Sequence, residues 1–208
     1  RLDNLPDKVA IHINDTHPAL CIPELMRILM DVYSYSWESA WTIVTKVVSY
    51  TNHTVLPEAL EKWNVALFKL KLPRIYMIVE EINRRLCADL WNMYPGDWDR
   101  ISRMAVIGYS QVRMANLSVA ASHTVNGVSA LHSDILKRTV FHDYYNAMPY
   151  KFTNVTNGIA MRRWLCFSNA GLSSLLDETL GREYHKNFEL LTGFKKYVND
   201  NTVKEKLK

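Results

Sequence analysis

A polar cluster near the start of the chain holds the first side chains that could bind or transform a ligand. In His12-Ile-Asn-Asp15-Thr-His17, two imidazoles and a carboxylate stand within six residues, directly after a β-branched stretch. Ligand-contacting groups of open α/β sheets usually lie just beyond the end of a strand, so this cluster is a candidate binding loop. Its histidine spacing matches no H-E-x-x-H or comparable metal motif, and we predict no metal site. The structural alternative is a capping role, in which Asp15 or Thr16 accepts hydrogen bonds from helix amides.

Two further polar clusters lie at Asn52-His53-Thr54 and at Thr153-Asn154-Val-Thr-Asn157-Gly158. His53 is either a hydrogen-bonding group for a polar ligand or a satisfied core histidine, which is the commoner fate of a lone histidine. The Asn-Gly pair is typical of a tight turn. The Arg162-Arg-Trp164 run that follows could cover an anion, or it could form a surface pair and a core aromatic. The residues alone leave these alternatives open.

The composition is that of a globular protein and excludes several classes of function. Of the 208 residues, 48% are hydrophobic, 22% charged and 11% aromatic. A net charge of +4 is too small for a dedicated nucleic-acid binder, and no apolar run reaches the ~18 residues of a membrane helix. We therefore predict neither nucleic acid nor membrane as a partner. Cys21, Cys87 and Cys166 lie far apart without a C-x-x-C pair, which favours a reducing compartment. Dinucleotide-binding, P-loop and G-x-S-x-G motifs are absent from the sequence.

The elements that position these clusters are mostly helical. Residues 8–13 are β-branched and roughly alternating, which predicts a strand. Apolar spacing and proline starts predict helices over residues 23–32, 37–48, 57–63 and 73–94. In the longest helix, Glu80–Arg84 and Glu81–Arg85 are expected to pair across one turn. Asp97 is expected to cap the next helix, which ends near Met104.

The second half of the chain predicts shorter helices. Residues 112–123 fit either a helix or a strand, and we favour a helix. Short helices are expected over residues 129–137, 141–145, 172–180 and 192–198, with a loop over 148–157. Asn201 or Thr202 is expected to cap a last helix that stops before its own end. With no initiator methionine at Arg1, the chain is expected to be an internal segment of a longer protein.

Taken together and in order, several runs resemble one family, the glycogen, starch and maltodextrin phosphorylases, which are α-glucan phosphorylases. The resemblance covers the chain from about residue 7 and rests on Asn14-Asp-Thr-His-Pro18, Ile22-Pro-Glu-Leu-Met-Arg27, Tyr50-Thr-Asn-His-Thr-Val-Leu-Pro-Glu-Ala-Leu-Glu61, Pro95-Gly-Asp97, Ser122-His-Thr-Val-Asn-Gly-Val128, His132-Ser-Asp-Ile-Leu-Lys137, Thr156-Asn-Gly-Ile159 and Arg162-Arg-Trp-Leu165. One departure is Ala160-Met161, where the family usually has Thr-Pro. Loss of the fixed proline φ angle loosens the segment between Asn157 and Trp164.

The resemblance implies an α/β fold of the glycosyltransferase-B type in the parent protein, with two Rossmann-like domains facing a cleft. Within it, this chain is expected to be predominantly helical with few strands. Residues 1–157 would be the latter part of the N-terminal, glucan-side domain, and residues 158–208 the truncated start of the C-terminal, cofactor-side domain. The implied reaction is cleavage of α-1,4-glucan by inorganic phosphate to give glucose 1-phosphate with retention of configuration. The implied enzyme is a cytoplasmic, allosteric homodimer with pyridoxal 5′-phosphate bound to a lysine outside this chain.

The resemblance also implies roles for single residues. Asp15 and His17 match the motif beneath the bound sugar, and Val128 an apolar wall of its pocket. His53 matches the histidine that contacts the glucosyl hydroxymethyl group, with its backbone carbonyl near the developing positive charge of the transition state, and it is the catalytic candidate. Asn157 matches an asparagine that binds the outer sugar hydroxyls, which require both a donor and an acceptor. Trp164 matches a tryptophan beside the cofactor.

Because the cofactor lysine and the phosphate-binding cluster are expected beyond Lys208, the 208 residues alone are expected to lack turnover and bound cofactor. The alternative function is a noncatalytic glucan-binding or scaffold module of the same fold. A helical protein-interaction domain is a third possibility, in which changes at Asp15, His53 and Asn157 would leave glucan binding unaltered. The sequence does not distinguish glycogen, starch and maltodextrin as the substrate.

Overall fold

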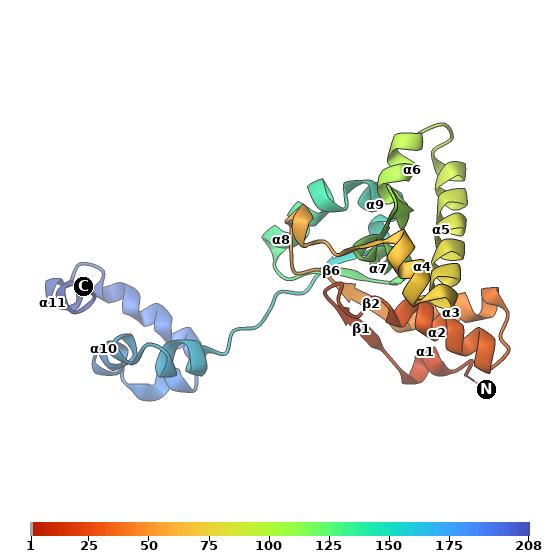
Figure 1. Cartoon of the computed structure of the whole chain (residues 1–208). Helices are drawn as coiled ribbons and strands as arrows, with labels where there is room; N and C mark the ends of the chain where they lie inside the picture. Colours follow the sequence, from red (N-terminus) through yellow and green to blue (C-terminus); the bar gives the residue numbers. More distant parts are fainter. Residues whose placement is uncertain (1) are drawn as a thin grey trace. The chain divides into compact units, whose positions relative to one another are not determined.

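The structure is a computed structural model that describes residues 2–208, and it divides the chain into two compact units (Figure 1). The first unit ends at Thr156 and the second runs from Asn157 to Lys208. Each unit has its own buried apolar residues. The chain is mostly helical, with a few short strands in one parallel and one antiparallel sheet. The predicted mixture of many helices and few strands is therefore confirmed.

A four-stranded parallel sheet forms the centre of the first unit. Its strands are β1 Ile11–Asn14, β2 Val48–Thr51, β6 Val125–Gly127 and β7 Phe152–Asn154, in the order β1-β2-β6-β7. The register places Tyr50 between Ile13 and Val125, and all three side chains are buried. The strand predicted over residues 8–13 is confirmed in part: β1 begins at Ile11 and extends to Asn14, whereas Lys8 belongs to a short helix. The predicted loop over 148–157 is wrong where it contains β7.

Helices connect and cover the strands of this sheet. α2 and α3 connect β1 to β2, while α8 and α9 connect β6 to β7. α7 contacts β2, and α8 contacts β6 and β7. The helices of the first unit are α1 Leu5–Lys8, α2 Cys21–Arg27, α3 Trp37–Val47, α4 Val65–Lys71, α5 Pro73–Met93, α6 Trp98–Met104, α7 Met114–Ala121, α8 Ala130–Ile135 and α9 His142–Ala147. Single π-helical turns extend α2 over Ile28–Val32 and α8 over Leu136–Val140, and 3₁₀ turns lie at Pro57–Ala59 and Pro149–Lys151.

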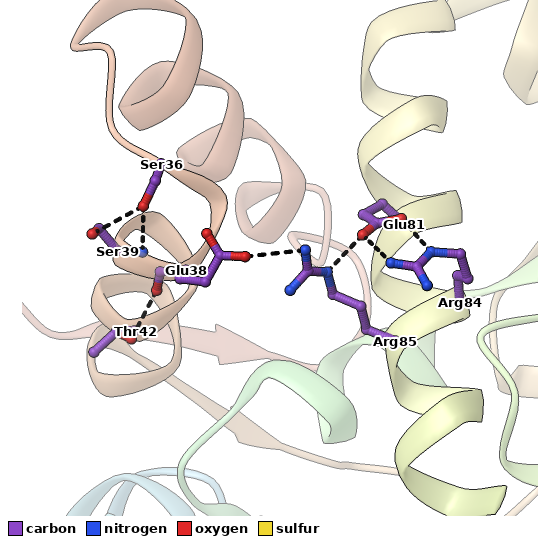
Figure 2. Close-up of polar contacts among 7 residues, drawn as sticks. All are labelled: Ser36, Glu38, Ser39, Thr42, Glu81, Arg84 and Arg85. Carbon is purple, nitrogen blue, oxygen red and sulfur yellow. Dashed lines mark hydrogen bonds and ion pairs between the residues drawn. The ribbon is translucent and has the colours of Figure 1, made fainter.

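The long helix α5 follows its predicted apolar pattern. Residues at helical spacing bury one face, namely Ile75, Ile78, Val79, Ile82, Leu86 and Leu90. On the outer side, Glu81 accepts hydrogen bonds from both Arg84 and Arg85, which lower the pKa of its carboxyl group to about 2 (Figure 2). The predicted Glu81–Arg85 pair is confirmed. The predicted Glu80–Arg84 pair is wrong, because Arg84 turns to Glu81 and Glu80 accepts from the Tyr76 hydroxyl at 3.1 Å.

A small antiparallel sheet lies in the long connection between β2 and β6. Its strands are β3 Lys62–Asn64, β4 Ile107–Gly108 and β5 Gln111–Arg113, in the order β3-β5-β4. The predicted helix over 57–63 is therefore wrong: a 3₁₀ turn is followed by β3, in which Trp63 pairs with Val112 of β5. Pairing between residues far apart in sequence overrides local helix propensity here. The helix favoured within 112–123 is confirmed over α7, although its first residues belong to β5.

Among its described residues, 157–208, the second unit contains helical segments joined by short loops and no strand. It consists of a π-helical turn Arg162–Phe167, α10 Ala170–Leu180, 3₁₀ segments Arg182–His185 and Phe188–Tyr197, and α11 Asn201–Lys206. Leu175, Leu176, Tyr184 and Val203 form its buried apolar residues. The expected cap of α11 is wrong by one residue: Asp200 accepts from the backbone N–H groups of Thr202 and Val203.

The N-cap of α6 gives a stability prediction. Asp97 accepts a hydrogen bond from the backbone N–H of Arg100 at 3.1 Å, as the sequence predicts. We expect Asp97→Ala to lower the free energy of unfolding by about 1 kcal/mol, because the first turn loses an acceptor for an otherwise unpaired amide. Urea unfolding followed by circular dichroism measures the change. Asp97→Asn keeps the acceptor and removes the charge, so it should retain most of the stability. Equal losses in the two variants would contradict the capping role.

Lys151 caps the C-terminal end of α7 from a buried position. Its Nζ donates to the carbonyl oxygens of Val119 and Ala120, at 3.1 and 2.8 Å, in the last turn of α7. The side chain is 9% exposed, and burial lowers the pKa of Lys151 from 10.5 to about 8. Between these two values the unfolded chain binds more protons than the folded chain. The contribution of Lys151 to stability therefore increases as the pH rises through this range.

We compare the free energy of unfolding of the native chain with that of Lys151→Met at two pH values. The native chain should gain stability relative to the variant, on the order of 2 kcal/mol, between about pH 7 and about pH 10. Methionine has a similar volume and does not titrate, so the difference isolates Lys151. Arg85, Asp89 and His123 line the same cavity and are present in both proteins. Urea unfolding at the two pH values measures the change. If the two proteins differ in stability by the same amount at both pH values, burial does not lower the pKa of Lys151.

Candidate functional site

Parallel pairing brings the carboxyl ends of β1, β2, β6 and β7 to one edge of the sheet, which we call the carboxyl edge. This is the edge at which open α/β sheets bind their ligands. The candidate residues of the first unit all follow one of these strand ends: Asp15 and His17 after β1, His53 after β2, and Val128 after β6. Residues that lie up to 113 positions apart in the sequence thus share one loop region.

The loop after β1 begins at Asp15, whose φ angle is +61°. This left-handed conformation is uncommon for a residue other than glycine, and aspartate is among the side chains that tolerate it. The backbone N–H of Asp15 donates to the Thr51 carbonyl at 2.9 Å, and its carboxylate accepts from the N–H of Thr16 at 2.6 Å. The alternative in which Asp15 or Thr16 caps a helix is wrong, because α2 has Leu20 at its N-cap and no side-chain cap.

Glu61 holds the same loop from a distant part of the chain. Its carboxylate accepts from the Thr16 hydroxyl at 3.3 Å and from the Trp63 indole N–H at 2.9 Å, and it lies 3.7 Å from Nδ1 of His17. The His17 side chain is 80% exposed, so its imidazole is open to a ligand. Sequence reasoning assigned no role to Glu61. Its position at the end of the recognised Tyr50–Glu61 run was the available signal.

His53 joins the ends of two strands. Its Nε2 lies 2.5 Å from Oδ1 of Asn14, the last residue of β1, and the histidine is exposed. The alternative of a core histidine is therefore wrong. An amide oxygen only accepts hydrogen bonds, so Nε2 carries the hydrogen and Nδ1 of the neutral ring remains an acceptor. The arrangement fixes the ring direction while leaving one nitrogen for a ligand hydroxyl.

His132 positions Val128 and lies close to His53. Nδ1 of His132 accepts from the backbone N–H of Val128 at 3.1 Å, which requires a neutral imidazole. Burial lowers the pKa of His132, the carbonyl of Thr54 opposes that shift, and the neighbouring His53 adds to it. Sequence reasoning assigned no role to His132, although it lies in one of the recognised runs.

A layer of polar side chains connects the strands beneath these loops. Thr51 Oγ1 lies 2.6 Å from Nε2 of His12 and accepts from Nδ2 of Asn126 at 3.3 Å. The amide oxygen of Asn126 in turn accepts from the N–H of Val155 at 2.5 Å. These contacts join β1, β2 and β6 to the residue that follows β7. Thr51 at the centre of these contacts is buried, and a connected set of hydrogen bonds restricts the loops around it, which lowers the entropy lost on binding.

Asn157 and Trp164 belong to the second unit. Asn157 is its first residue and is exposed. The Trp164 indole is 63% exposed, and the Arg163 guanidinium lies 5.9 Å from its ring centre. One exposed indole beside one cation does not enclose a flat cofactor. The residues that the structure describes therefore do not form a pyridoxal phosphate site by themselves, and we derive no reaction step through that group.

Two other features are absent from the described residues, 2–208. Within that range, no group of three or more histidine, cysteine, aspartate or glutamate side chains is placed to hold a metal ion. No helix among the described residues has the length and apolar character needed to cross a membrane. Cys21, Cys87 and Cys166 are all free thiols.

The carboxyl edge presents donors and acceptors without a concentrated charge. An imidazole acceptor at His53, a carboxylate at Asp15 and an open imidazole at His17 are suited to a ligand rich in hydroxyl groups, which both donate and accept. Val128 adds a half-buried apolar side chain to this edge. The arrangement therefore fits a sugar better than a phosphate cluster or a metal ion.

The chain matches the carbohydrate phosphorylase family over residues 1–208. It is 53% identical over 199 residues to a glycogen phosphorylase of Bacillus subtilis (strain 168), covering 96% of this chain and 25% of that protein. It is 49% identical over 201 residues to the muscle form of glycogen phosphorylase of Bos taurus and 47% identical to that of Homo sapiens, with 95% of this chain and 24% of each relative covered. The chain thus spans about a quarter of the length of these relatives.

Proposed function

Because this chain belongs to the carbohydrate phosphorylase family, we propose that the whole protein of which it forms part is an α-1,4-glucan phosphorylase. In the proposed reaction, the bond between the anomeric carbon of the terminal glucosyl unit and the glucan oxygen breaks. A bond from that carbon to an oxygen of inorganic phosphate forms with retention of configuration. The glucan oxygen takes up the proton that the phosphate loses, and glucose 1-phosphate is released. Glycogen, starch and maltodextrin all contain the required linkage.

One observation supports this proposal beyond the family relationship. Asp15, His17, His53 and Val128 follow three neighbouring parallel strands at the ligand-binding edge of the sheet. The His53 and His17 side chains are exposed, so packing does not require them at this edge. Exposed polar groups converging from separate loops are better explained by ligand binding than by packing.

His53 is the proposed catalytic residue. We assign its imidazole to the hydroxymethyl group of the reacting glucosyl unit and its backbone carbonyl to the region of the anomeric carbon. Positive charge grows on that carbon in the transition state, so a carbonyl dipole directed at it lowers the barrier. The contact from Asn14 Oδ1 to Nε2 restricts the ring, and thereby the loop that carries the carbonyl.

The other residues are proposed to bind and orient the sugar. Within the first unit, Asp15 and His17 are proposed to lie beneath it and Val128 to form an apolar wall. Asn157 of the second unit is proposed, on the family relationship alone, to bind sugar hydroxyl groups. The amide of asparagine can donate and accept at the same time. Glu61 and His132 are proposed to position this set, because Glu61 accepts from the Thr16 hydroxyl and His132 accepts from the Val128 backbone N–H.

The proposed whole protein has two domains of the glycosyltransferase-B type. The residues up to 157 would belong to its N-terminal domain and residues 158–208 to the start of its C-terminal domain. The boundary between the compact units after Thr156 supports this division. Pyridoxal phosphate is the proposed cofactor, with Trp164 beside it. A cytoplasmic, allosteric homodimer is proposed on the family relationship alone. Because these residues span a quarter of the relatives' length, we propose that they do not turn over glucan without the remaining chain.

Hydrogen–deuterium exchange of the whole protein with maltoheptaose tests the location of the site. We expect slower exchange in the loops after β1, β2 and β6, around residues 14–17, 52–54 and 127–129. The loops at the opposite edge of the sheet, including residues 122–124, should be unchanged and are the internal control. Protection confined to that opposite edge would contradict the proposed placement of the sugar.

A further inference from the structure

A cavity of about 310 Å³ lies away from the carboxyl edge. Its lining includes His123, two residues before β6, and Lys151, directly before β7, so it is at the amino end of the parallel strands. We call it the amino-edge cavity. Trp37 and Trp41 of α3 and Arg85 of α5 form its outer wall. Its volume is at the lower end of the range for small-molecule sites.

Two buried donors in this cavity have no hydrogen-bond partner among the described residues. Ser122 is fully buried, and its Oγ is unpaired. Nε1 of Trp37 is buried and likewise unpaired. A buried polar group left without a partner is unfavourable, and such groups are rare in folded proteins. Both residues line the cavity, so a ligand there would provide the missing acceptors.

Lys151 adds a third donor. Its ammonium group has three hydrogens, and two are directed to the carbonyl oxygens of Val119 and Ala120. One hydrogen therefore remains for a ligand. Among the described residues that line the cavity, Asp89 has the one carboxylate, and Asp89 is exposed. The interior thus has an excess of donors over acceptors.

The cation of Arg85 is already neutralised by its neighbours. It pairs with Glu81 at 2.6 Å and with Glu38 at 3.2 Å, so it connects α5 to α3 (Figure 2). Its guanidinium lies 5.0 Å from the Trp37 ring centre, and the Trp37 ring stacks with that of Trp41 at 6.5 Å. These contacts fix the Trp37 indole, and with it the direction of its N–H.

We propose that the amino-edge cavity binds a small anion, a carboxylate or a phosphate, whose oxygens accept hydrogen bonds from Ser122, Trp37 and Lys151. Anionic oxygens are the acceptors that match three convergent donors, one of them charged. The stacked indoles form a flat apolar wall that favours a ligand with a planar group. This inference does not depend on glucan binding, because none of these residues belongs to the carboxyl edge.

The indole N–H signal of Trp37 in ¹⁵N-labelled chain provides a direct test. The signal is assigned by its loss in Trp37→Phe, and inorganic phosphate and sodium benzoate are titrated separately. We expect a saturable shift of the Trp37 signal with at least one probe. The probe that binds with the higher affinity identifies phosphate or carboxylate as the favoured group. Ser122→Ala and Lys151→Met should each weaken that probe at least tenfold, whereas Ser174→Ala, at an exposed serine of the second unit, should not.

A thermal measurement separates binding from folding. Since the Ser122 hydroxyl has no partner, Ser122→Ala and the native chain should have the same melting temperature in the absence of ligand. The bound probe should raise the melting temperature of the native chain but not that of Ser122→Ala. The proposal is overturned if neither probe shifts the Trp37 signal. Equal shifts of all indole signals, or unchanged affinity in both Ser122→Ala and Lys151→Met, would also overturn it.

Discussion

Gly127→Ala is expected to lower the free energy of unfolding of the chain by about 3 kcal/mol, the upper part of the usual range for overpacking. A Cβ atom on Gly127 would lie 2.3 Å from Oγ of Ser133, 2.8 Å from its Cα and 2.9 Å from its backbone N. The hydroxyl could turn away, but the Cα and N atoms belong to the first turns of α8 and cannot. The β6 strand and α8 would have to separate.

The contacts around Ser133 leave little freedom for such a separation. Its N–H donates to the Ser129 carbonyl at 2.9 Å, and its hydroxyl donates to Oδ1 of Asn154 at 2.8 Å. A shift of α8 would therefore also disturb the ends of β6 and β7, and with them Val128. Urea unfolding measures the loss of stability. Gly158→Ala is the matched control, because a Cβ there meets no atom within 4 Å. Equal stability of the two variants would contradict the close packing at Gly127.

His53→Ala is expected to reduce kcat/KM of the whole protein for maltoheptaose by about 10²-fold or more, the usual loss when one group that stabilises the transition state is removed. The residue is exposed, so the variant should keep the stability of the native protein. Steady-state phosphorolysis measures the rate. This prediction depends on the proposed function.

Two further variants make the His53 result specific. His142→Ala removes another exposed histidine, whose Nε2 lies 3.0 Å from Nδ2 of Asn146, and should leave the rate unchanged. Asn14→Ala removes the partner of Nε2 and should cause a smaller loss than His53→Ala, because it affects only the position of the ring. A native rate in His53→Ala, or the same loss in His142→Ala, would contradict the assigned role.

The elements that could be predicted are those whose signal is local. The apolar period of α5 repeats over 21 residues, and Asp97 and Pro73 mark helix starts within one turn. β2 and β7 could not be predicted in this way, because strands of four and three residues take their stability from neighbours far along the chain. β3 was mistaken for a helix for the same reason, since its partner β5 begins at Gln111.

The residues of the candidate site also differ in whether a local sequence signal identifies them. The polar clusters after β1 and β2 could be found because residue type and position near a strand end suffice to suggest them. Glu61 and His132 could not, because their roles depend on contacts with Thr16 and Val128 that only the folded chain creates. The sequence also did not indicate that Lys151, in a predicted loop, would cap α7 from a buried position.

Phosphate-dependent formation of glucose 1-phosphate from maltoheptaose by the whole protein is the direct test of the proposed phosphorylase activity. We expect the α-anomer of glucose 1-phosphate to appear only when inorganic phosphate is present, and the rate to fall in His53→Ala but not in His142→Ala. Binding of maltoheptaose without product would instead indicate a noncatalytic glucan-binding module. That outcome, or release of free glucose without phosphate, would contradict the claim.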